Sequence, residues 1–104
     1  MSEDRRAMHV GICRLVFRLP ENDNLKGKRR AIQSLSTRIR AKFNVAVAEV
    51  GDLDVWQAAT LGISCVSNDG RHANAMISNV VTYVTQIRDD LELVDYEVEI
   101  LDGL

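Results

Sequence analysis

The sequence predicts an α+β fold of the ferredoxin-like type, a βαββαβ sandwich with a four-stranded antiparallel sheet and two helices on one face. Segments with the periodicity of strands and helices follow one another in the order strand, helix, strand, strand, helix, strand. The length of 104 residues is typical of one domain, and 46% hydrophobic with 27% charged residues is an ordinary globular composition. We therefore expect a single domain over residues 1–104, of which residues 1–7 form a flexible start.

The first strand and the first helix are separated by a short turn. Apolar and polar residues alternate over residues 8–19, and Pro20, which has no backbone N–H to donate, ends the strand. Asp23 or Asn24 is a suitable N-cap for a helix over residues 25–41. The apolar face of this helix consists of Leu25, Ile32, Leu35 and Ile39.

Two strands and a connection occupy the middle of the chain. Residues 43–50 are rich in small and β-branched side chains, which predicts the second strand. A turn over residues 51–54 then opens a connection that includes Trp56. The third strand is predicted over residues 58–67, and the turn-forming residues at 68–70 stop it.

The chain ends with a second helix and a fourth strand. The helix is predicted over residues 71–89, and the strand over residues 91–101 alternates apolar with acidic side chains. The helix residues expected to face the core are Ala73, Met76, Ile77, Val80, Val84 and Ile87.

This topology assigns the two faces of the sheet, with the first and third strands at its centre. The core is expected to contain Leu15, Phe17, Leu61 and Ile63, together with Val98, Ile100 and the helix faces. The face without helices is expected to carry Val10, Ile12, Arg14, Val16, Arg18, Asp95, Glu97 and Glu99. Its apolar members Val10, Ile12 and Val16 predict a dimer or partner surface. Trp56 is either a lid over the core or an interface anchor.

A basic segment from Lys26 to Lys42 is the main compositional feature. It holds seven basic residues and no acidic one, a local charge of +7 in a protein of net charge −2, which suggests an anionic partner. The side chains expected on the solvent side of the helix are Lys26, Arg29, Arg30 and Arg40. Lys28 falls among the apolar positions, so it must extend past the edge of the core or meet a carboxylate.

Two interpretations of the basic helix stay open. It is a solvated face balanced by acidic neighbours, or its side chains and helix-terminal amides bind phosphate. The candidate anion-binding or RNA-binding residues are Lys26, Lys28, Arg29, Arg30 and Arg40. Aromatic residues make up only 5% of the chain, and the strands lack the aromatic pairs that stack bases. Any contact with RNA is therefore expected to be with phosphates.

Three separated motifs carry a resemblance to a known family. NLKGKRR at 24–30, FNVAVAEV at 43–50 and DLDVWQAATLGISCVSND at 52–69 resemble the YlxP-like family of small bacterial proteins. The resemblance implies the same ferredoxin-like fold and no established activity. The genes of that family often lie beside genes for translation and ribosome maturation, which implies ribosomal RNA or a ribosome-associated protein as partner. The chain departs from the family pattern at Asn24, where Ser is usual, and at Gly27, where a charged residue is usual.

The motifs of common enzymes do not occur in this sequence. There is no GxxxxGK[ST] or GxGxxG run, so the two common nucleotide-binding motifs are missing. Cys13 and Cys65 have no CxxC spacing and lie in strand-like runs, so we expect reduced core thiols. His9 and His72 are not at metal-ligand spacing. We expect no catalytic residue, no metal and no cofactor.

One acidic cluster has two interpretations. Glu49, Asp52 and Asp54 surround a turn beside Trp56, and three carboxylates at this spacing could hold a hard cation. An ordinary acidic loop is the favoured interpretation, because the chain has no twelve-residue calcium loop and no companion Glu at the required place.

The location is expected to be cytoplasmic, without a membrane partner. No apolar run approaches the roughly 20 residues that cross a bilayer, and the start of the chain has acidic residues and no apolar signal region.

Three classes of function follow from these observations. The first is a non-catalytic accessory protein that docks on ribosomal RNA or a ribosome-associated factor through the basic helix. The second is a homo-oligomeric interaction module that uses the open sheet face. The third is an enzyme or small-molecule sensor with a pocket near Asp52, Asp54 and Trp56.

Overall fold

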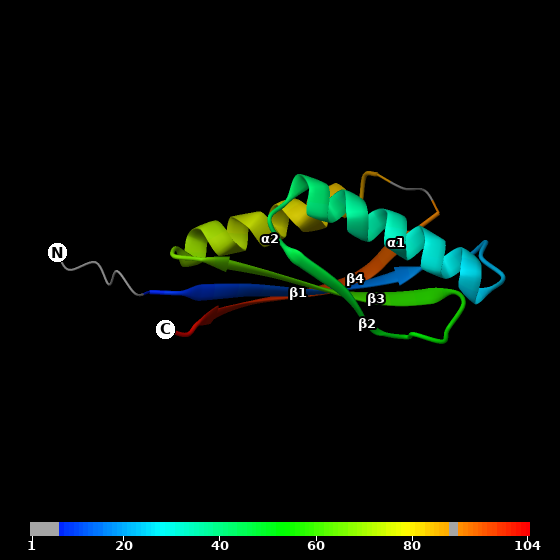
Figure 1. The fold of residues 1–104 in the computed structure, drawn as a ribbon, viewed down its shortest axis with the longest axis horizontal. Helices are drawn as coiled ribbons and strands as arrows, with labels where there is room; N and C mark the ends of the chain where they lie inside the picture. The colour runs from blue at the N-terminus through cyan, green and yellow to red at the C-terminus, as the bar shows by residue number, and fades with distance from the viewer. Residues whose placement is uncertain (1–6, 88–89) are drawn as a thin grey trace.

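The structure, a computed structural model, describes residues 7–87 and 90–104 and has the predicted architecture. Its elements are β1 (His9–Arg18), α1 (Leu25–Lys42), β2 (Ala46–Gly51), β3 (Ala58–Ser67), α2 (Gly70–Val84) and β4 (Glu92–Asp102). The four strands form one antiparallel sheet in the order β2-β3-β1-β4, and both helices lie on the same face of it (Figure 1). The ferredoxin-like fold is thus confirmed. A flexible start is predicted for residues 1–7, and residues 1–6 of it lie outside the described part of the chain.

The end of α1 explains why β2 begins three residues later than predicted. The backbone N–H of Phe43 donates to the carbonyl of Ile39 at 2.8 Å, so Phe43 closes the helix and does not start the strand. Its ring packs edge-on against Tyr83 of α2, with 5.5 Å between ring centroids. The apolar residue that resembles the start of a strand therefore serves helix–helix packing, and β2 begins at Ala46.

Helix α2 begins where expected and ends earlier. Asp69 caps its first turn by accepting a hydrogen bond from the backbone N–H of Arg71 at 2.9 Å. The helix ends at Val84, where the N–H of Gln86 bonds the carbonyl of Tyr83 in a tighter turn. The predicted helix is too long, because residues 85–87 are not part of α2. The last two residues of the prediction, 88–89, lie outside the part of the chain that the structure describes. No helix in the described ranges is both long enough and apolar enough to cross a bilayer.

The core lies between the sheet and the two helices. The predicted core residues Leu15, Phe17, Leu61 and Ile63 are all buried, as are the helix residues Ala31, Ile32, Leu35, Ile39, Ala73, Ile77, Val80 and Val84. The prediction for Val98 is wrong, because this side chain is 38% exposed. Val98 pairs with buried Cys13 and so shares its face of the sheet, but β4 is an edge strand and the helices leave this part of it uncovered.

Gly11 lies where α2 packs tightly against the sheet. A Cβ atom at this position would lie 3.0 Å from Cys65 Sγ, 3.0 Å from Ile77 Cγ1 and 3.4 Å from the backbone carbonyl oxygen of Ala73. Two of these contacts come from α2, so any side chain here would push the helix away from β1 and β3.

We predict that Gly11→Ala lowers the free energy of unfolding by about 1 to 3 kcal/mol, the cost of inserting a methyl group into a filled core. Urea denaturation measures this change. The matched control is Gly103→Ala, where an added Cβ meets nothing within 4 Å. Equal stability of the two variants would contradict the close packing of α2 on β1.

Candidate functional site

The side chain of Lys28 lies at the junction of α1, β2 and the loop over residues 52–57. It is 0% exposed. Its ammonium group donates to the backbone carbonyls of Asp52 and Val55, the latter at 2.9 Å, and lies 3.0 Å from Glu49 Oε2. The carbonyl of Leu53, 3.4 Å from Nζ, is a third acceptor, so loop carbonyls face all three N–H donors of the ammonium group.

Glu49 supplies the negative charge that this burial requires. An unpaired ammonium group in the protein interior is costly, and a carboxylate compensates it only at close range. Glu49 Oε2 is itself buried and accepts no well-aligned hydrogen bond among the described residues, so its attraction to Lys28 is mainly Coulombic. The expectation that Lys28 meets a carboxylate is met. Its assignment to an exposed anion-binding surface is corrected, because its charge is already compensated inside the protein.

The N-terminal turn of α1 is built to hold Lys28 in this place. Asn24 is the N-cap, and its side-chain oxygen accepts from the N–H of Gly27 at 2.7 Å. A Cβ at Gly27 would come within 2.4 Å of Asn22 Oδ1. Glycine at position 27 therefore makes room for Asn22, whose Nδ2 donates to the carbonyl of Trp56 at 2.6 Å.

The loop over residues 52–57 turns carbonyls inward and side chains outward. Asp52 adopts a left-handed backbone conformation with φ of 60°, and its carboxylate accepts from Thr60 Oγ1 at 2.8 Å. The carbonyl of Gln57 accepts from the N–H of Leu19 at 2.9 Å. The apolar side chains that remain exposed are those of Leu53, Val55 and Trp56, with Trp56 53% exposed.

The acidic cluster in this region does not form a carboxylate cage. Glu49 is paired with Lys28, and Asp52 is bonded to Thr60. Within the described ranges, no three His, Cys, Asp or Glu side chains come together in a way that could hold a metal ion. The ammonium group of Lys28 occupies the position where a cation at this turn would meet the loop carbonyls.

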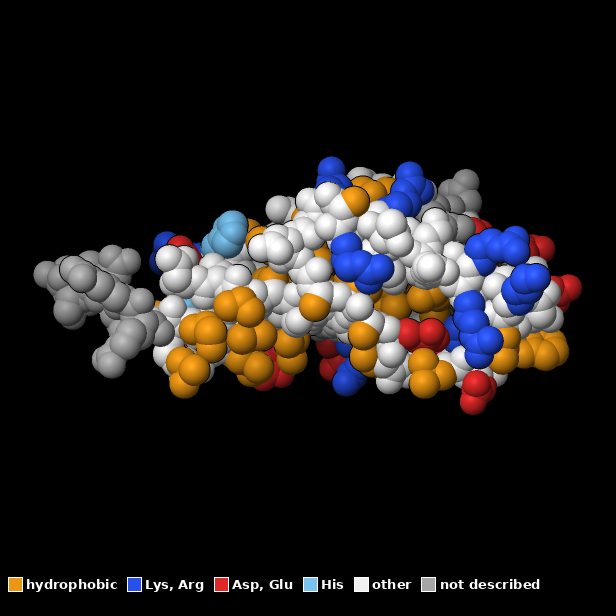
Figure 2. Space-filling view, in the orientation of Figure 1, with side chains coloured by type: hydrophobic (Ala, Val, Ile, Leu, Met, Phe, Trp, Pro, Cys, Tyr) orange, Lys and Arg blue, Asp and Glu red, His pale blue; other side chains and the backbone are white. Residues whose placement is uncertain are grey.

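The outer face of α1 carries a row of exposed cations, which we call the basic face: Lys26, Arg29, Arg30, Arg38 and Arg40. Figure 2 shows Lys and Arg side chains spread along this helix. Across the described part of the chain, none of these five side chains forms an ion pair. The first turn of α1 has no acidic residue. Lys42, beyond the row, lies over the ring of Tyr83, with 5.3 Å from its Nζ to the ring centroid.

The open face of the sheet is a second surface with a defined pattern. An apolar row crosses the sheet from Val66 on β3 through Val10 on β1 to Leu101 on β4. Ile12 lies on β1 in the next row. Figure 2 shows hydrophobic side chains gathered at this end of the molecule. Of the predicted interface residues, Ile12 is 37% exposed, whereas Val10 and Val16 are half-buried.

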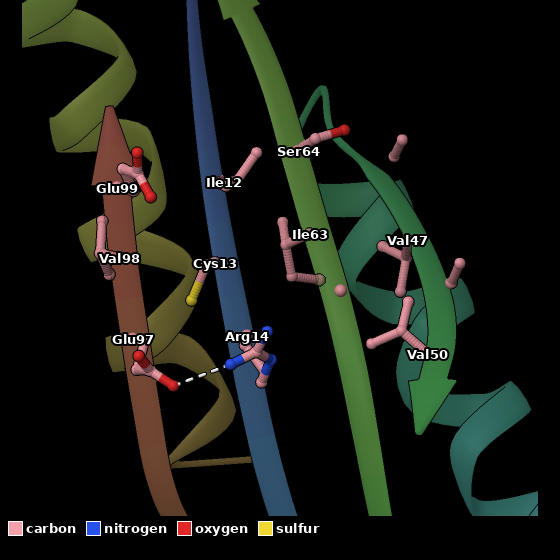
Figure 3. A pocket seen from close by; sticks show the side chains of 13 residues that line it. Ile12, Cys13, Arg14, Val47, Val50, Ile63, Ser64, Glu97, Val98 and Glu99 are labelled. Atoms are coloured by element: carbon pink, nitrogen blue, oxygen red, sulfur yellow. Dashed lines mark hydrogen bonds and ion pairs between the residues drawn. The ribbon is translucent and has the colours of Figure 1, made fainter. Parts of the chain in front are cut away.

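A shallow depression of about 550 Å³ continues this face toward β2 (Figure 3). Ile12, Ala46, Ala48 and Val50 contribute apolar side chains to it. An ion pair between Arg14 and Glu97, 2.9 Å long, lies at its β4 side. The pocket expected near Asp52, Asp54 and Trp56 is not this depression, which lies on the other side of β2 and β3 from the helices.

The remaining reactive side chains are held in structural contacts. Burial raises the pKa of the Cys13 thiol to about 11, so this group stays protonated at neutral pH and is a poor nucleophile. The Sγ atom of buried Cys65 lies 3.8 Å from the carbonyl of Ala73. His9 Nδ1 lies 2.5 Å from Asp102 Oδ1, which joins β1 to β4 at the end of the sheet.

Sequence reasoning missed the carbonyl partners of Lys28 and the exposure of β4. The first could not be read from residue types, because backbone carbonyls carry no sequence signal. A signal did exist for the ion pair: a lysine on the apolar face of a helix together with a glutamate in the following strand. The exposure of β4 depends on which strand lies at the edge of the sheet and on how far the helices extend over it.

Comparisons with known proteins identify related sequences and name no activity. The family described as "Protein of unknown function (DUF503)" matches residues 10–98. The chain is also similar to a protein of Bacillus subtilis (strain 168) described as "Uncharacterized protein YlxP". The two are 33% identical over 61 residues, which cover 59% of this chain and 66% of the relative. The match thus spans just under two thirds of the length of the relative.

We predict that Lys28→Met lowers the free energy of unfolding by about 3 to 5 kcal/mol, because Glu49 and the loop carbonyls lose their partner. Trp56 is the single tryptophan of the chain, so its fluorescence during urea denaturation follows the affected loop directly. The control is Lys26→Met in the same helical turn, which removes an exposed cation and should change stability by less than about 0.5 kcal/mol. A Lys28→Met variant as stable as this control would show that the buried ammonium group does not hold the loop.

Proposed function

This chain belongs to the DUF503 family of YlxP-like proteins, and we propose that it is a non-catalytic accessory protein that docks on RNA phosphates through the basic face of α1. The partner is ribosomal RNA, directly or within a ribosomal particle, in the cytoplasm. The supporting observation is that all five cations of the basic face are exposed and have no ion-pair partner in the described ranges.

The unpaired state of these cations favours binding over solvation alone. A basic surface that serves only solubility is usually interspersed with acidic side chains. Here the row extends over the length of an 18-residue helix without an acidic residue. Cations in the first turn also oppose the positive end of the helix dipole, at a cost of about 0.3 to 1 kcal/mol each. A bound phosphate group would offset both the repulsion among these cations and their unfavourable interaction with the helix dipole.

The distribution of charge favours docking by one face. The sequence pI is about 5.6, and the acidic side chains of β4 lie on the opposite side of the protein from α1. Phosphates are attracted to α1 and repelled by β4, so the molecule approaches RNA helix first. Contacts of this kind depend steeply on salt and only weakly on base sequence.

We predict that Lys26→Glu/Arg29→Glu abolishes co-sedimentation with ribosomal subunits at low salt. The slope of log affinity against log salt concentration should become shallower by about 1 for each cation removed. Because acidic side chains near a helix N-terminus are favourable, the variant should stay folded.

The matched control is Arg18→Glu/Arg71→Glu, which makes the same change in net charge at exposed positions outside α1. This control should still sediment with the subunits. If wild-type protein remains at the top of the gradient at low salt, or if both variants lose binding equally, the basic face is not the docking site.

Self-association through the open sheet face is a second candidate function. The observation that favours it is the continuous apolar row of Val66, Val10 and Leu101, beside Ile12 and the depression toward β2. Val66 is 66% exposed and Leu101 is 41% exposed. Contiguous apolar side chains on a sheet surface commonly mark an interface.

We predict that Val66→Asp/Ile12→Asp dissociates a homo-oligomer formed by this face, because each substitution places a charge in the buried contact. Sedimentation equilibrium measures the assembly state. The variant Lys26→Glu/Arg29→Glu should remain assembled, since it alters the other side of the molecule. A wild-type protein that is monomeric at all accessible concentrations would rule out this candidate.

A further inference from the structure

Strand β4 is a long edge strand with one unpaired side. It runs from Glu92 to Asp102 and occupies the end of the sheet order, with β1 as its neighbour. No other strand of the described chain pairs with its outer edge. A row of free backbone N–H and C=O groups is a template for another strand, and proteins usually shorten, cover or bend such an edge.

The helix side of β4 has an exposed apolar part. Tyr96 is 52% exposed and Val98 is 38% exposed, whereas Leu93 and Ile100 pack against the core. Val98 pairs with Cys13 and Tyr96 with Leu15, both buried, so these two side chains point to the core side and extend beyond the helices. An additional strand beside β4 would find apolar contacts here.

The open side of β4 is acidic and lacks counter-charges. Glu97 is paired with Arg14, but Asp95 lies opposite Val16 and Glu99 lies opposite Ile12. Both Asp95 and Glu99 are exposed and form no ion pair with any residue that the structure describes. Figure 3 shows Glu97 and Glu99 on β4, with Val98 between them.

This charge pattern disfavours a second copy of β4 as the partner strand. When two identical strands pair antiparallel about a twofold axis, residues of one face lie opposite residues of the same face. If the twofold axis passes through Glu97, Asp95 of one copy lies opposite Glu99 of the other. An axis through Val98 places Glu97 opposite Glu99. An axis through Tyr96 places Asp95 opposite Glu97. Like charges directly across a sheet are destabilising, so these three registers, which pair the central part of β4 with itself, each carry a penalty. RNA is disfavoured for the same reason, because its phosphates meet carboxylates.

We propose that β4 binds an extended segment of a partner protein in which Lys or Arg alternates with apolar residues. Its basic side chains lie opposite Asp95 and Glu99 on the open face, and its apolar side chains lie beside Tyr96 and Val98. Backbone hydrogen bonds to the outer edge of β4 provide affinity, and the alternation provides register. This surface is separate from the basic face of α1, so binding at one does not depend on the function of the other.

A fluorescent peptide that alternates Lys and Val tests the proposal by anisotropy. We expect saturable binding, and protection of β4 amides from hydrogen exchange when the peptide is present. A peptide with Glu in place of Lys should not bind. A Lys-Val peptide with every backbone amide N-methylated keeps the charge but cannot pair as a strand, and it should not bind either.

Charge reversal on the protein locates the site. Asp95→Lys/Glu99→Lys should weaken binding at least about tenfold, because two favourable cross-strand pairs become unfavourable. The matched control Glu21→Lys/Asp54→Lys makes the same change in net charge at exposed positions outside the sheet and should bind like wild type.

Three results would overturn the proposal. The first is equal binding of the N-methylated peptide, which would show a charged surface without strand pairing. The second is equal loss in both charge-reversed proteins, or no binding by wild-type protein. The third is protection of β4 amides in a wild-type dimer without peptide, which would show that a second copy covers this edge.

Discussion

The buried ammonium group of Lys28 is the interaction on which the rest of the structure depends. It satisfies carbonyls of the loop over residues 52–57 and compensates Glu49 of β2, while its own backbone belongs to α1. One side chain thus joins α1, the edge strand β2 and the loop that connects β2 with β3. A buried ion pair contributes little net stability compared with apolar packing, but removing one partner is costly. The ion pair therefore mainly fixes the conformation of the loop, in which the carbonyls point toward Lys28 and the side chain of Trp56 is exposed.

The same constraint shapes the surface. Glu49 is the acidic residue of β2 and is paired with Lys28, and the five cations of the basic face form no ion pair with any described residue. Strand β4 carries five carboxylates, and among the described residues Glu97 alone of these is paired with an arginine. The protein is thus electrically asymmetric, positive along one helix and negative along one sheet edge. Such an arrangement orients the molecule toward a charged partner and lets two partners of opposite charge bind without competition.

Most of the fold follows from local patterns. Alternation in β1 and β3, a 3.6-residue period in α1, and Asn24 as N-cap each arise from neighbouring residues, and each was predictable. The errors occur where distant contacts decide. Phe43 resembles the start of a strand, but its contact with Tyr83 makes it the end of a helix. Val98 has the periodicity of a core residue, but the helices leave this part of the edge strand β4 uncovered. The position of Lys28 on the apolar face indicated an unusual environment without showing what surrounds it.

The sequence alone determined the order of the elements, the two faces of the sheet and the presence of a basic helix, because these depend on periodicity and on the charges of residues close in the chain. Only the tertiary structure decided which charges remain free. Lys28 and Arg29 are adjacent in sequence, yet one is enclosed by loop carbonyls and Glu49 while the other is exposed on α1. The physical reason is that neutralisation and burial depend on residues brought together from distant parts of the chain, and no local pattern records those distances.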